Sequence, residues 1–396
     1  MKVVSIIGTR PQFIKAATVS HAFFRHNKKV SGKKLMFDEI IIHTGQHFNA
    51  DMSDIFFREL DLPKPSYNLF INNTSHGAMT GRMLMKIEEI LIKENPNLVL
   101  VYGDTNSTLA GALASAKLHI PLVHIEAGLR SYNRQMPEEF NRVLTDHCSH
   151  ILFCPSTRSI ENLKFEGIVN DYTYNENLTY SHHQIKIPKH QFPRKILMVG
   201  DVMFDSLLCN VKKAEKRSDI LKRLNLKPQT YVLVTVHRAE NTDQSNRLSS
   251  ILDGLSQIAK EGIKVIIPLH PRTRQCLIAQ KLKTPKLEVI DPVCYLDMLI
   301  LEKKAKIVLT DSGGVQKEAY WLKVPCVTLR EETEWIETVE VGWNVLVGAD
   351  AEEIFKVVSY FKPPQHHPNL YGDGHAAERI VKYLASHRLT NQLINN

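Results

Sequence analysis

The stretch "KIVLTDSGGVQKEA", residues 306–319, decides the fold class because it joins an apolar, strand-like run directly to a helix. The predicted strand ends in Asp311-Ser312, and the predicted helix begins on Gly313 and Gly314. A helix N-terminus carries unpaired N–H groups and partial positive charge, and glycines lack the Cβ atoms that keep an anion at a distance. With the Ser312 hydroxyl, the stretch predicts a phosphate-binding turn. For this motif alone, a plain helix cap with a tight glycine turn fits equally well.

Short apolar runs of strand character alternate with helical stretches along the whole chain of 396 residues. Helical periodicity is clear at 81–94 and 108–119. The predicted strands occupy residues 3–8, 39–45, 98–104, 121–127, 150–155, 195–201, 231–237, 264–270, 287–292, 306–312, 324–330 and 344–348. Uninterrupted apolar strands between helices indicate an α/β fold with parallel sheets that are covered on both faces.

The number of predicted strands exceeds what one ordinary open sheet holds. The polar stretch at 168–195 lacks helical periodicity and predicts a long loop. We therefore expect two doubly wound domains, residues 1–200 and 201–374. A helix at 375–396 follows a proline-rich break and is expected to cross back to the first domain.

Composition and charge narrow the function classes. Hydrophobic residues make up 43% of the chain and charged residues 23%, and no apolar run reaches the roughly 20 residues that a membrane helix needs. The first residues do not resemble a signal peptide, so we expect a cytoplasmic protein. The net charge of +8 is dispersed, which argues against nucleic acid and is compatible with an anionic small molecule. The cysteines form no C-x-x-C pair and no group has metal-ligand spacing, so no metal site is indicated.

Polar side chains gather at the predicted carboxyl ends of the strands, the edge where open α/β sheets bind ligands. In the first half these residues are Arg10, Lys15, Gln46, His47, Asp104 and Glu126, and "MPEEFNR" adds Glu138, Glu139 and Arg142. Cations at the start of a helix oppose its dipole, so Arg10 and Lys15 indicate an anion, although a plain surface pair is the alternative. Glu138 and Arg142 are four residues apart on one helix face, a spacing that most often means a surface ion pair.

Converging carboxylates require balancing cations or a shared proton. Carboxylates with pKa values pushed apart are the groups that acid/base chemistry uses. For Asp104 a helix cap is a plausible alternative role. For Glu126 it is less so, because Ala127 and Gly128 follow and no helix is expected there.

The second half gathers cations at its strand ends. The residues are His237, Arg238, His270, Arg272 and Arg274. Together with the Ser-Gly-Gly turn they suit a diphosphate, and Glu318, one turn into the helix, suits a pair of ribose hydroxyls. Tyr295 suits stacking on a base, although an aromatic residue there is more often core. We expect a nucleoside diphosphate in the second domain and acid/base groups in the first, an arrangement that a sugar nucleotide would span.

The motifs of the chain also resemble those of a known family. "GTRPQFIK", "HTGQH", "YGDTNST", "HIEAGLRS", "MPEEFNR", "VHRAEN", "LHPR", "DSGGVQKEA" and "YGDGHAAERI" occur in order along nearly the whole chain. Together they resemble the non-hydrolysing UDP-N-acetylglucosamine 2-epimerases. "GTRPQFIKA", "HTGQHFNADMSDIFF" and "SYNRQMPEE" are closer to the subgroup that acts on UDP-2,3-diacetamido-2,3-dideoxy-glucuronate.

The resemblance implies two Rossmann-like domains facing each other across a cleft in a GT-B-like arrangement, with acid/base residues in the first and UDP in the second. It implies a homodimer that needs no cofactor or metal. The implied reaction inverts C2 of a UDP-2-acetamido sugar by eliminating UDP to a 2-acetamidoglucal and adding it back, for surface polysaccharide precursor synthesis.

The resemblance also implies roles for single residues. The implied catalytic residues are Asp104, Glu126, Glu138, Arg142, Lys15 and His237. The implied substrate-binding residues are Arg10, Ser312, Gly313, Gly314 and Glu318, to which the strand-end analysis adds Tyr295 and Arg238. Gln46, His47 and His270 border a second UDP-sugar site in the family. The alternatives are a UDP-sugar-dependent GT-B glycosyltransferase and a UDP-sugar-binding regulator without catalysis.

Overall fold

The computed structural model describes residues 1–30, 35–46, 62–72, 74–170, 194–284 and 286–386. It divides into two compact units, Met1–Ser206 with Tyr371–Asn396 and Leu207–Leu370. Each unit contains one parallel sheet, so the predicted α/β class with two Rossmann-like sheets is confirmed. The loop predicted at 168–195 lies mostly outside the described residues. Within those ranges no helix is long and apolar enough to cross a membrane.

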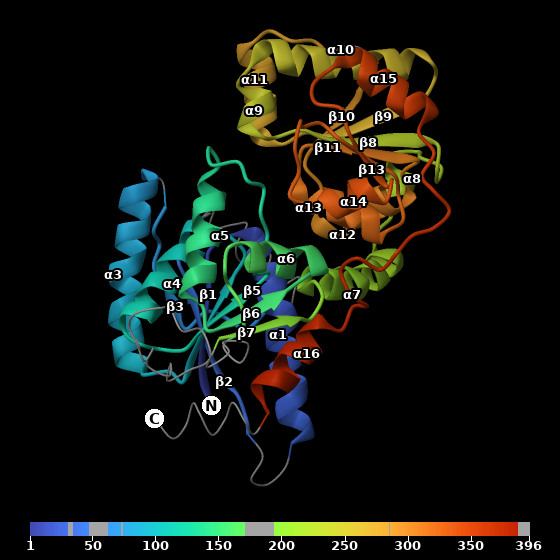
Figure 1. The fold of residues 1–396 in the computed structure, drawn as a ribbon. Coiled ribbons are helices and arrows are strands. Elements are labelled where there is room, and N and C mark those ends of the chain that lie inside the picture. The colour runs from blue at the N-terminus through green and yellow to red at the C-terminus, as the bar shows by residue number, and fades with distance from the viewer. Residues whose placement is uncertain (31–34, 47–61, 73, 171–193, 285, 387–396) are drawn as a thin grey trace, which may run out of the picture. The chain divides into compact units, whose positions relative to one another are not determined.

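The first unit is a parallel sheet with helices on both faces (Figure 1). Its strands are β1 (Lys2–Ile7), β2 (Asp38–His43), β3 (Tyr67–Asn68), β4 (Leu98–Tyr102), β5 (Leu122–Ile125), β6 (Ile151–Cys154) and β7 (Lys195–Met198). Its helices are α1 (Arg10–Lys29), α3 (His76–Glu94), α4 (Asn106–Lys117), α5 (Pro137–Cys148), α6 (Thr157–Phe165) and α16 (Ala376–Leu384), and α7 (Val202–Arg217) contains the boundary between the units. The strand order is β3-β2-β1-β4-β5-β6-β7.

Apolar spacing explains how the helices of the first unit pack. Met83, Ile87 and Leu91 recur every four residues on α3, so they form one stripe, which is fully buried against β1 and β4. The small side chains of α4 allow its close approach to the same face. On the opposite face α16 lies beside α1 (Figure 1), and Tyr383 of α16 packs edge-on against Phe153 with ring centroids 5.8 Å apart. The predicted return of the C-terminal helix to the first unit is therefore confirmed.

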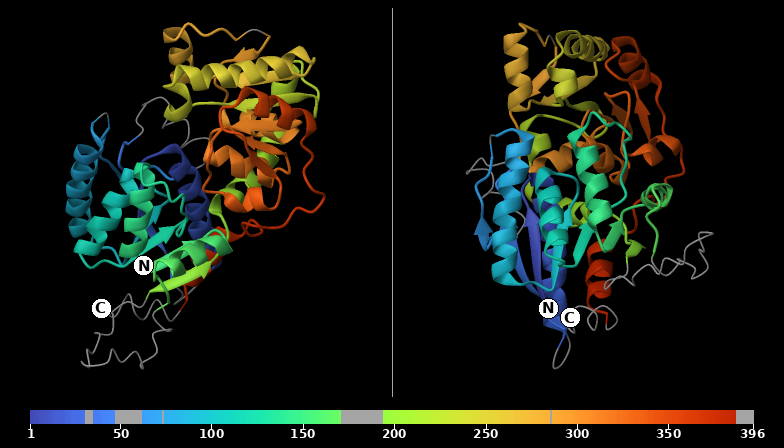
Figure 2. Two further views of the ribbon diagram at one scale, coloured as in Figure 1. Left: turned by 45° about the horizontal axis from the view of Figure 1, so that its top comes forward. Right: turned by 60° about the vertical axis from the view of Figure 1, so that its left-hand side comes forward.

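The second unit repeats the same architecture with a shorter sheet. Its strands are β8 (Tyr231–Thr235), β9 (Lys264–Pro268), β10 (Glu288–Ile290), β11 (Ile307–Thr310), β12 (Cys326–Thr328) and β13 (Asn344–Leu346), in the order β10-β9-β8-β11-β12-β13. Its helices are α8 (Ile220–Arg223), α9 (Ala239–Thr242), α10 (Ser245–Lys260), α11 (Pro271–Ala279), α12 (Tyr295–Lys304), α13 (Gly313–Trp321), α14 (Ile336–Glu340) and α15 (Ala351–Tyr360). Helices α10 and α15 lie side by side over one face (Figure 2).

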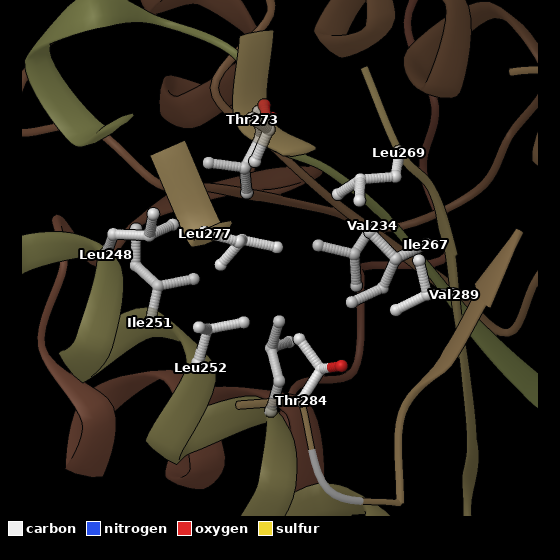
Figure 3. Close-up of a pocket in the computed structure, with 12 residues that line it drawn as sticks. Val234, Leu248, Ile251, Leu252, Ile267, Leu269, Thr273, Leu277, Thr284 and Val289 are labelled. Carbon is white, nitrogen blue, oxygen red and sulfur yellow. The ribbon is translucent and has the colours of Figure 1, made fainter. Parts of the chain in front are cut away.

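A small cavity lies inside the core of the second unit (Figure 3). Its volume is about 20 Å³, and apolar side chains such as Val234, Leu252, Ile267 and Leu277 line it. A cavity of this size has room for about one water molecule, and an apolar lining leaves such a cavity dry. It is therefore a packing defect between α10, α11 and the sheet, and the functional groups have to be sought at the strand ends.

The strand predictions are confirmed, and the differences are local. Each of the twelve predicted runs contains a strand, whereas β3 was not predicted because two residues are too few to show a period. Helix α3 begins at His76, five residues before the predicted start, with Ser75 as its N-cap. Helix α13 begins on Gly313 with Ser312 as N-cap, as the opening motif predicts.

Helix α16 receives its N-terminal cap from another helix. The carboxylate of Asp205, on α7, accepts hydrogen bonds from the backbone N–H groups of Ala376 at 3.0 Å and Ala377 at 2.8 Å. A carboxylate at this end of a helix satisfies unpaired donors and complements the dipole. Asp205 therefore holds the returning segment against the first unit.

We predict that Asp205→Ala lowers the free energy of unfolding by about 1 kcal/mol at pH 7.5, because α16 loses its cap. Burial raises the pKa of Asp205 to about 6, so the folded protein holds this proton more readily than the unfolded chain. The stabilisation from this group is thus greatest at low pH and is lost as the pH rises through 6. The effect of the substitution is expected to grow by about 1 kcal/mol between pH 7.5 and pH 5, measured by urea unfolding.

Asp350 provides the control, since it caps α15 locally by accepting from the N–H groups of Glu352 and Glu353, both at 2.9 Å. Asp350→Ala calibrates the loss of an ordinary cap. An Asp205→Ala effect that shrinks toward pH 5 contradicts the assigned sign.

Candidate functional site

Both sheets place their charged groups at the point where the strand order reverses. In the first unit this point lies between β1 and β4, and in the second between β8 and β11. Loops that leave neighbouring strands in opposite directions there expose backbone groups and open a ligand site. The carboxyl ends of these strands carry the residues around Arg10 and Asp104 in one unit, and around His237 and Ser312 in the other.

The Lys15–Glu126 ion pair is a buried part of the first site. Lys15 lies in the second turn of α1, Glu126 follows β5, and their side chains are only 8% and 7% exposed. Gly103, at the end of β4, has φ +62°, and a Cβ on it would lie 3.1 Å from Lys15 Nζ and 3.2 Å from a Glu126 oxygen. Another residue here would strain the positive φ and press on the pair beside the turn that carries Asp104.

Glu126 itself has an unusual backbone. Its φ is +75°, in the left-handed region, and both its N–H and that of Ala127 donate to the carbonyl of Phe153 at 3.1 Å. For a non-glycine residue this conformation costs on the order of 1–3 kcal/mol and is concentrated at functional sites. The turn thus aims the carboxylate back toward Lys15 instead of continuing the strand.

Arg142 brings a second carboxylate to the same end of the sheet. Its Nη2 donates to Asp104 Oδ2 at 2.5 Å and its Nη1 to Glu139 Oε2 at 3.0 Å. Asn141 donates to the Asp104 carbonyl at 3.0 Å, so the acid is held through both its side chain and its backbone. The structure therefore brings Asp104, Glu126, Lys15 and Arg142 together, as the sequence predicts.

The expected pairing of Glu138 with Arg142 is wrong. Arg142 binds Glu139, whose carboxylate also accepts from the N–H groups of Ser131 and Tyr132 at 3.0 and 3.1 Å. Glu138 is half-buried in the first turn of α5 and makes no hydrogen bond or ion pair with the described residues. Both glutamates lie within one turn of Arg142, and the position of the 131–132 loop decides between them.

The remaining predicted residues of this unit lie nearby along the chain. Arg10 is exposed at the first residue of α1. Gln46 Oε1 accepts from the N–H and hydroxyl of Ser107 at 3.1 and 2.8 Å, which ties the end of β2 to the first turn of α4. His47 lies outside the described residues.

In the second unit a buried carboxylate organises the turn after β8. Asp311 is fully buried and accepts from the backbone N–H groups of His237 and Arg238 at 3.0–3.1 Å and from the Asn241 amide at 3.2 Å. It directly precedes the Ser312 turn. One side chain therefore fixes the His237-Arg238 turn relative to the start of α13.

His237 and His270 face each other within this group, with ring centroids 5.6 Å apart. Desolvation lowers the pKa of His237, and the cationic forms of His270, Arg238 and Arg272 lower it further against the opposing charge of Asp311. Burial and Arg272 lower the pKa of His270 as well. Both rings are therefore neutral at pH 7, and each can offer one N–H donor without adding a full charge.

The Ser-Gly-Gly turn opens α13 as a cradle of backbone donors. A Cβ on Gly313 would lie 3.2 Å from the indole nitrogen of Trp335, whereas one on Gly314 would meet no atom closer than 3.8 Å. Glu318 is buried one turn further along, and the Tyr295 hydroxyl donates to it at 3.1 Å. Tyr295 is only 5% exposed, so its ring supports Glu318 from the core.

Comparison with known proteins then settles the family. Residues 29–385 match the UDP-N-acetylglucosamine 2-epimerase family. The chain belongs to this family. It is 51% identical over 391 residues to a UDP-N-acetylglucosamine 2-epimerase homolog of Methanococcus maripaludis, and 49% identical over 387 residues to the UDP-2,3-diacetamido-2,3-dideoxy-D-glucuronate 2-epimerase of Pseudomonas aeruginosa. Each alignment covers 97% of this chain and 99% of the relative.

The epimerase fold is shared with solved structures. The crystal structure of the Methanocaldococcus jannaschii UDP-GlcNAc 2-epimerase, in complex with UDP-GlcNAc and UDP, superposes with a TM-score of 0.82 at 44% identity. The superposition covers 97% of this chain and 99% of the Methanocaldococcus jannaschii chain. The family and the enzyme class, an isomerase, are therefore as the motifs predict.

Sequence reasoning named Glu139 and Asp311 but did not predict that they position other side chains, and it did not single out Asn141 or Gln12. Glu139 and Asn141 hold Arg142 and Asp104, and Asp311 holds the two turns of the second unit. Gln12 is buried and links Gly8, at the end of β1, to the Tyr102 carbonyl at the end of β4. The available signal was a polar residue inside an otherwise apolar motif, which does not reveal its partner.

We predict that His237 titrates below its ordinary pKa of about 6.5, and that His270→Asn raises its pKa because a neighbouring cation is removed. The measurement is the pH dependence of the His237 ring signals by NMR, assigned with His237→Asn. Arg274→Gln is the matched control, because Arg274 pairs with Asp291 and does not shift His237. An unchanged or lower His237 pKa in His270→Asn contradicts the arrangement.

Proposed function

We propose that this epimerase inverts C2 of a UDP-2-acetamido sugar by eliminating UDP and adding it back. The observation that carries the proposal is the two ion pairs beside the Gly103 turn, the buried Lys15–Glu126 pair and the Arg142–Asp104 pair, in which Asp104 is 31% exposed. They place two carboxylates at one sheet end, where one can take a proton and another can return it. The second unit supplies the anion-binding turn.

The chemistry follows from these groups. A carboxylate of the first unit removes the C2 proton while the bond from C1 to the UDP oxygen breaks, which yields a 2-acetamidoglucal and UDP. Negative charge then grows on the diphosphate, and His237, Arg238, Arg10 and the N–H groups at Gly313 and Gly314 stabilise it. A proton next adds to the opposite face of C2, and the UDP oxygen adds back to C1. The overall reaction is redox-neutral.

Two substrates fit this proposal. Relatives at 45% and 49% identity are a UDP-N-acetylglucosamine 2-epimerase and a UDP-2,3-diacetamido-2,3-dideoxy-D-glucuronate 2-epimerase. The second sugar carries a carboxylate and requires one more cation near the ring. Parallel assays with the two nucleotide sugars, compared by kcat/KM, decide between them.

We further propose that the chain works as a homodimer in the cytoplasm. Phe140 and Leu144, four residues apart on α5, are each 45% exposed, and Met85 and Ile92, seven apart on α3, are 62% and 66% exposed. Apolar side chains that share a helix face support burial against a second copy. Light scattering of the wild type and of Leu144→Glu measures the assembly state.

The runner-up is a GT-B glycosyltransferase, which also binds a UDP-sugar but has no need for grouped carboxylates with cation partners. Incubation with each UDP-sugar in deuterium oxide without an acceptor separates the two. Deuterium at C2 with inverted product supports the epimerase. UDP release that depends on an added acceptor supports the transferase, and binding without either reaction supports a regulator.

We predict that Glu126→Gln lowers the rate of C2 deuterium exchange by about 10²–10⁴-fold, the range lost with an acid/base group. UDP binding is expected to persist, because the donor turn lies in the second unit. The readouts are NMR of the sugar and calorimetric titration of UDP. Glu161→Gln, on the surface of α6, is the control; retained exchange in Glu126→Gln removes this residue from the mechanism.

A further inference from the structure

A fully buried histidine joins the elements that carry the proposed acids. His124, on β5, lies two residues before Glu126 and is 0% exposed. Its Nδ1 lies 2.6 Å from Asp146 Oδ1 and its Nε2 lies 2.8 Å from the carbonyl oxygen of Gly103. Gly103 directly precedes Asp104, and Asp146 lies one turn after Arg142 on α5. One imidazole therefore bridges three elements of the site.

The partners of this ring determine its charge. A carbonyl oxygen can only accept, so Nε2 must carry a hydrogen. Asp146 Oδ2 accepts from Arg130 Nη1 at 2.7 Å and from the Gly128 N–H at 3.1 Å, contacts that favour a carboxylate. Burial opposes this ionisation, but the charges of His124 and Arg130 still lower the pKa of Asp146. With acceptors on both sides, both ring nitrogens of His124 donate, which makes the ring an imidazolium ion.

The surrounding charges form a group of four, and its Glu166 end is partly exposed and also lies 4.0 Å from the half-exposed His147. Arg130 is 2% exposed, donates to the Leu129 carbonyl at 2.6 Å and pairs with Glu166 through two bonds of 2.7 and 2.6 Å. His124 and Arg130 supply two positive charges, and Asp146 and Glu166 two negative charges. Such a group resists the loss of any one member, because the remaining charges would be left buried and unpaired.

We propose that the His124 imidazolium, with Asp146 and Arg130, is a positioning group that fixes the Asp104 and Glu126 turns relative to Arg142. It touches neither the sugar nor the diphosphate in the proposed reaction, and it rests on the proposed function only for its effect on turnover. The Gly103 carbonyl is bound on one side of the ring, and the Gly128 turn is bound through Asp146. Loss of the charge weakens the charge-assisted hydrogen bonds that hold both turns, and a displacement of about 1 Å at reacting groups can lower a rate by about 10²-fold.

The charge state is tested on the wild-type protein by ¹⁵N NMR of the histidine rings at pH 8. The expected result is that both ring nitrogens of His124 carry a hydrogen. The signal is assigned by its loss in His124→Gln or, should that variant not fold, through its backbone connection. One unprotonated ring nitrogen on His124 at this pH overturns the proposal, whether or not the protein turns over a UDP-sugar.

The positioning role is tested by the kinetics of Asp146→Asn, which keeps the side-chain shape and removes the charge. We expect kcat for C2 inversion to fall about 10²-fold, with KM and the affinity for UDP changed less than about threefold. Glu166→Gln, at the half-exposed end of the group, is expected to lower kcat less.

Thr145→Val is the matched control, since Thr145 is buried beside Asp146 and its hydroxyl has no hydrogen-bond partner among the described residues. A kcat for Asp146→Asn and Glu166→Gln equal to that of Thr145→Val overturns the role. Absence of C2 exchange in the wild type contradicts the proposed function instead, and the ring signals still decide the charge of His124.

Discussion

The buried ion pair between Lys15 and Glu126 is the interaction on which the first unit's site depends. Moving two charges out of water costs several kcal/mol for each ion, which only close pairing and further contacts offset. The pair accordingly dictates its surroundings. Gly103 leaves space that a Cβ would take from the pair, and the left-handed backbone of Glu126 turns its side chain toward Lys15. The pairing therefore fixes the direction of the Glu126 carboxylate.

The second unit solves a related problem with backbone donors. Among the residues that the structure describes, buried Asp311 contacts no lysine or arginine side chain directly and is held by the N–H groups of His237 and Arg238 and by Asn241. Charge-assisted hydrogen bonds of this kind stabilise an anion without bringing a cation into the core. Arg238, Arg272 and Arg274 remain partly or fully exposed, where an incoming anion can reach them, whereas Arg330 is buried against Glu334. This difference between the two sheet ends supports the proposal that the first transfers protons and the second binds a phosphate.

The sequence predicted the framework because the framework follows from local pattern. Apolar β-branched runs show buried strands directly, and Ser312 with Gly313 marks the start of α13. Contacts between elements carry no such pattern. Glu138 and Glu139 are both within helical reach of Arg142, so only the loop at 131–132 selects Glu139. His124, within an apolar strand, likewise indicates a plain core residue. The sequence does not show that Asp146, 22 residues further along the chain, lies against its ring.

The fold alone cannot separate an epimerase from a glycosyltransferase of the same architecture, since both place a nucleotide at the carboxyl ends of parallel strands. The distribution of charge does separate them. A transferase needs an acceptor site and a stabilised leaving group, and a protein of that kind gains nothing from grouping two cation-paired carboxylates, one of them buried, beside one glycine turn. Burying the charges of Lys15, Glu126 and Arg142 costs free energy. Proton transfer to and from the sugar is a function that explains why the protein bears this cost. The electrostatic cost of the first sheet's end is therefore the strongest physical argument that this unit performs chemistry on the sugar.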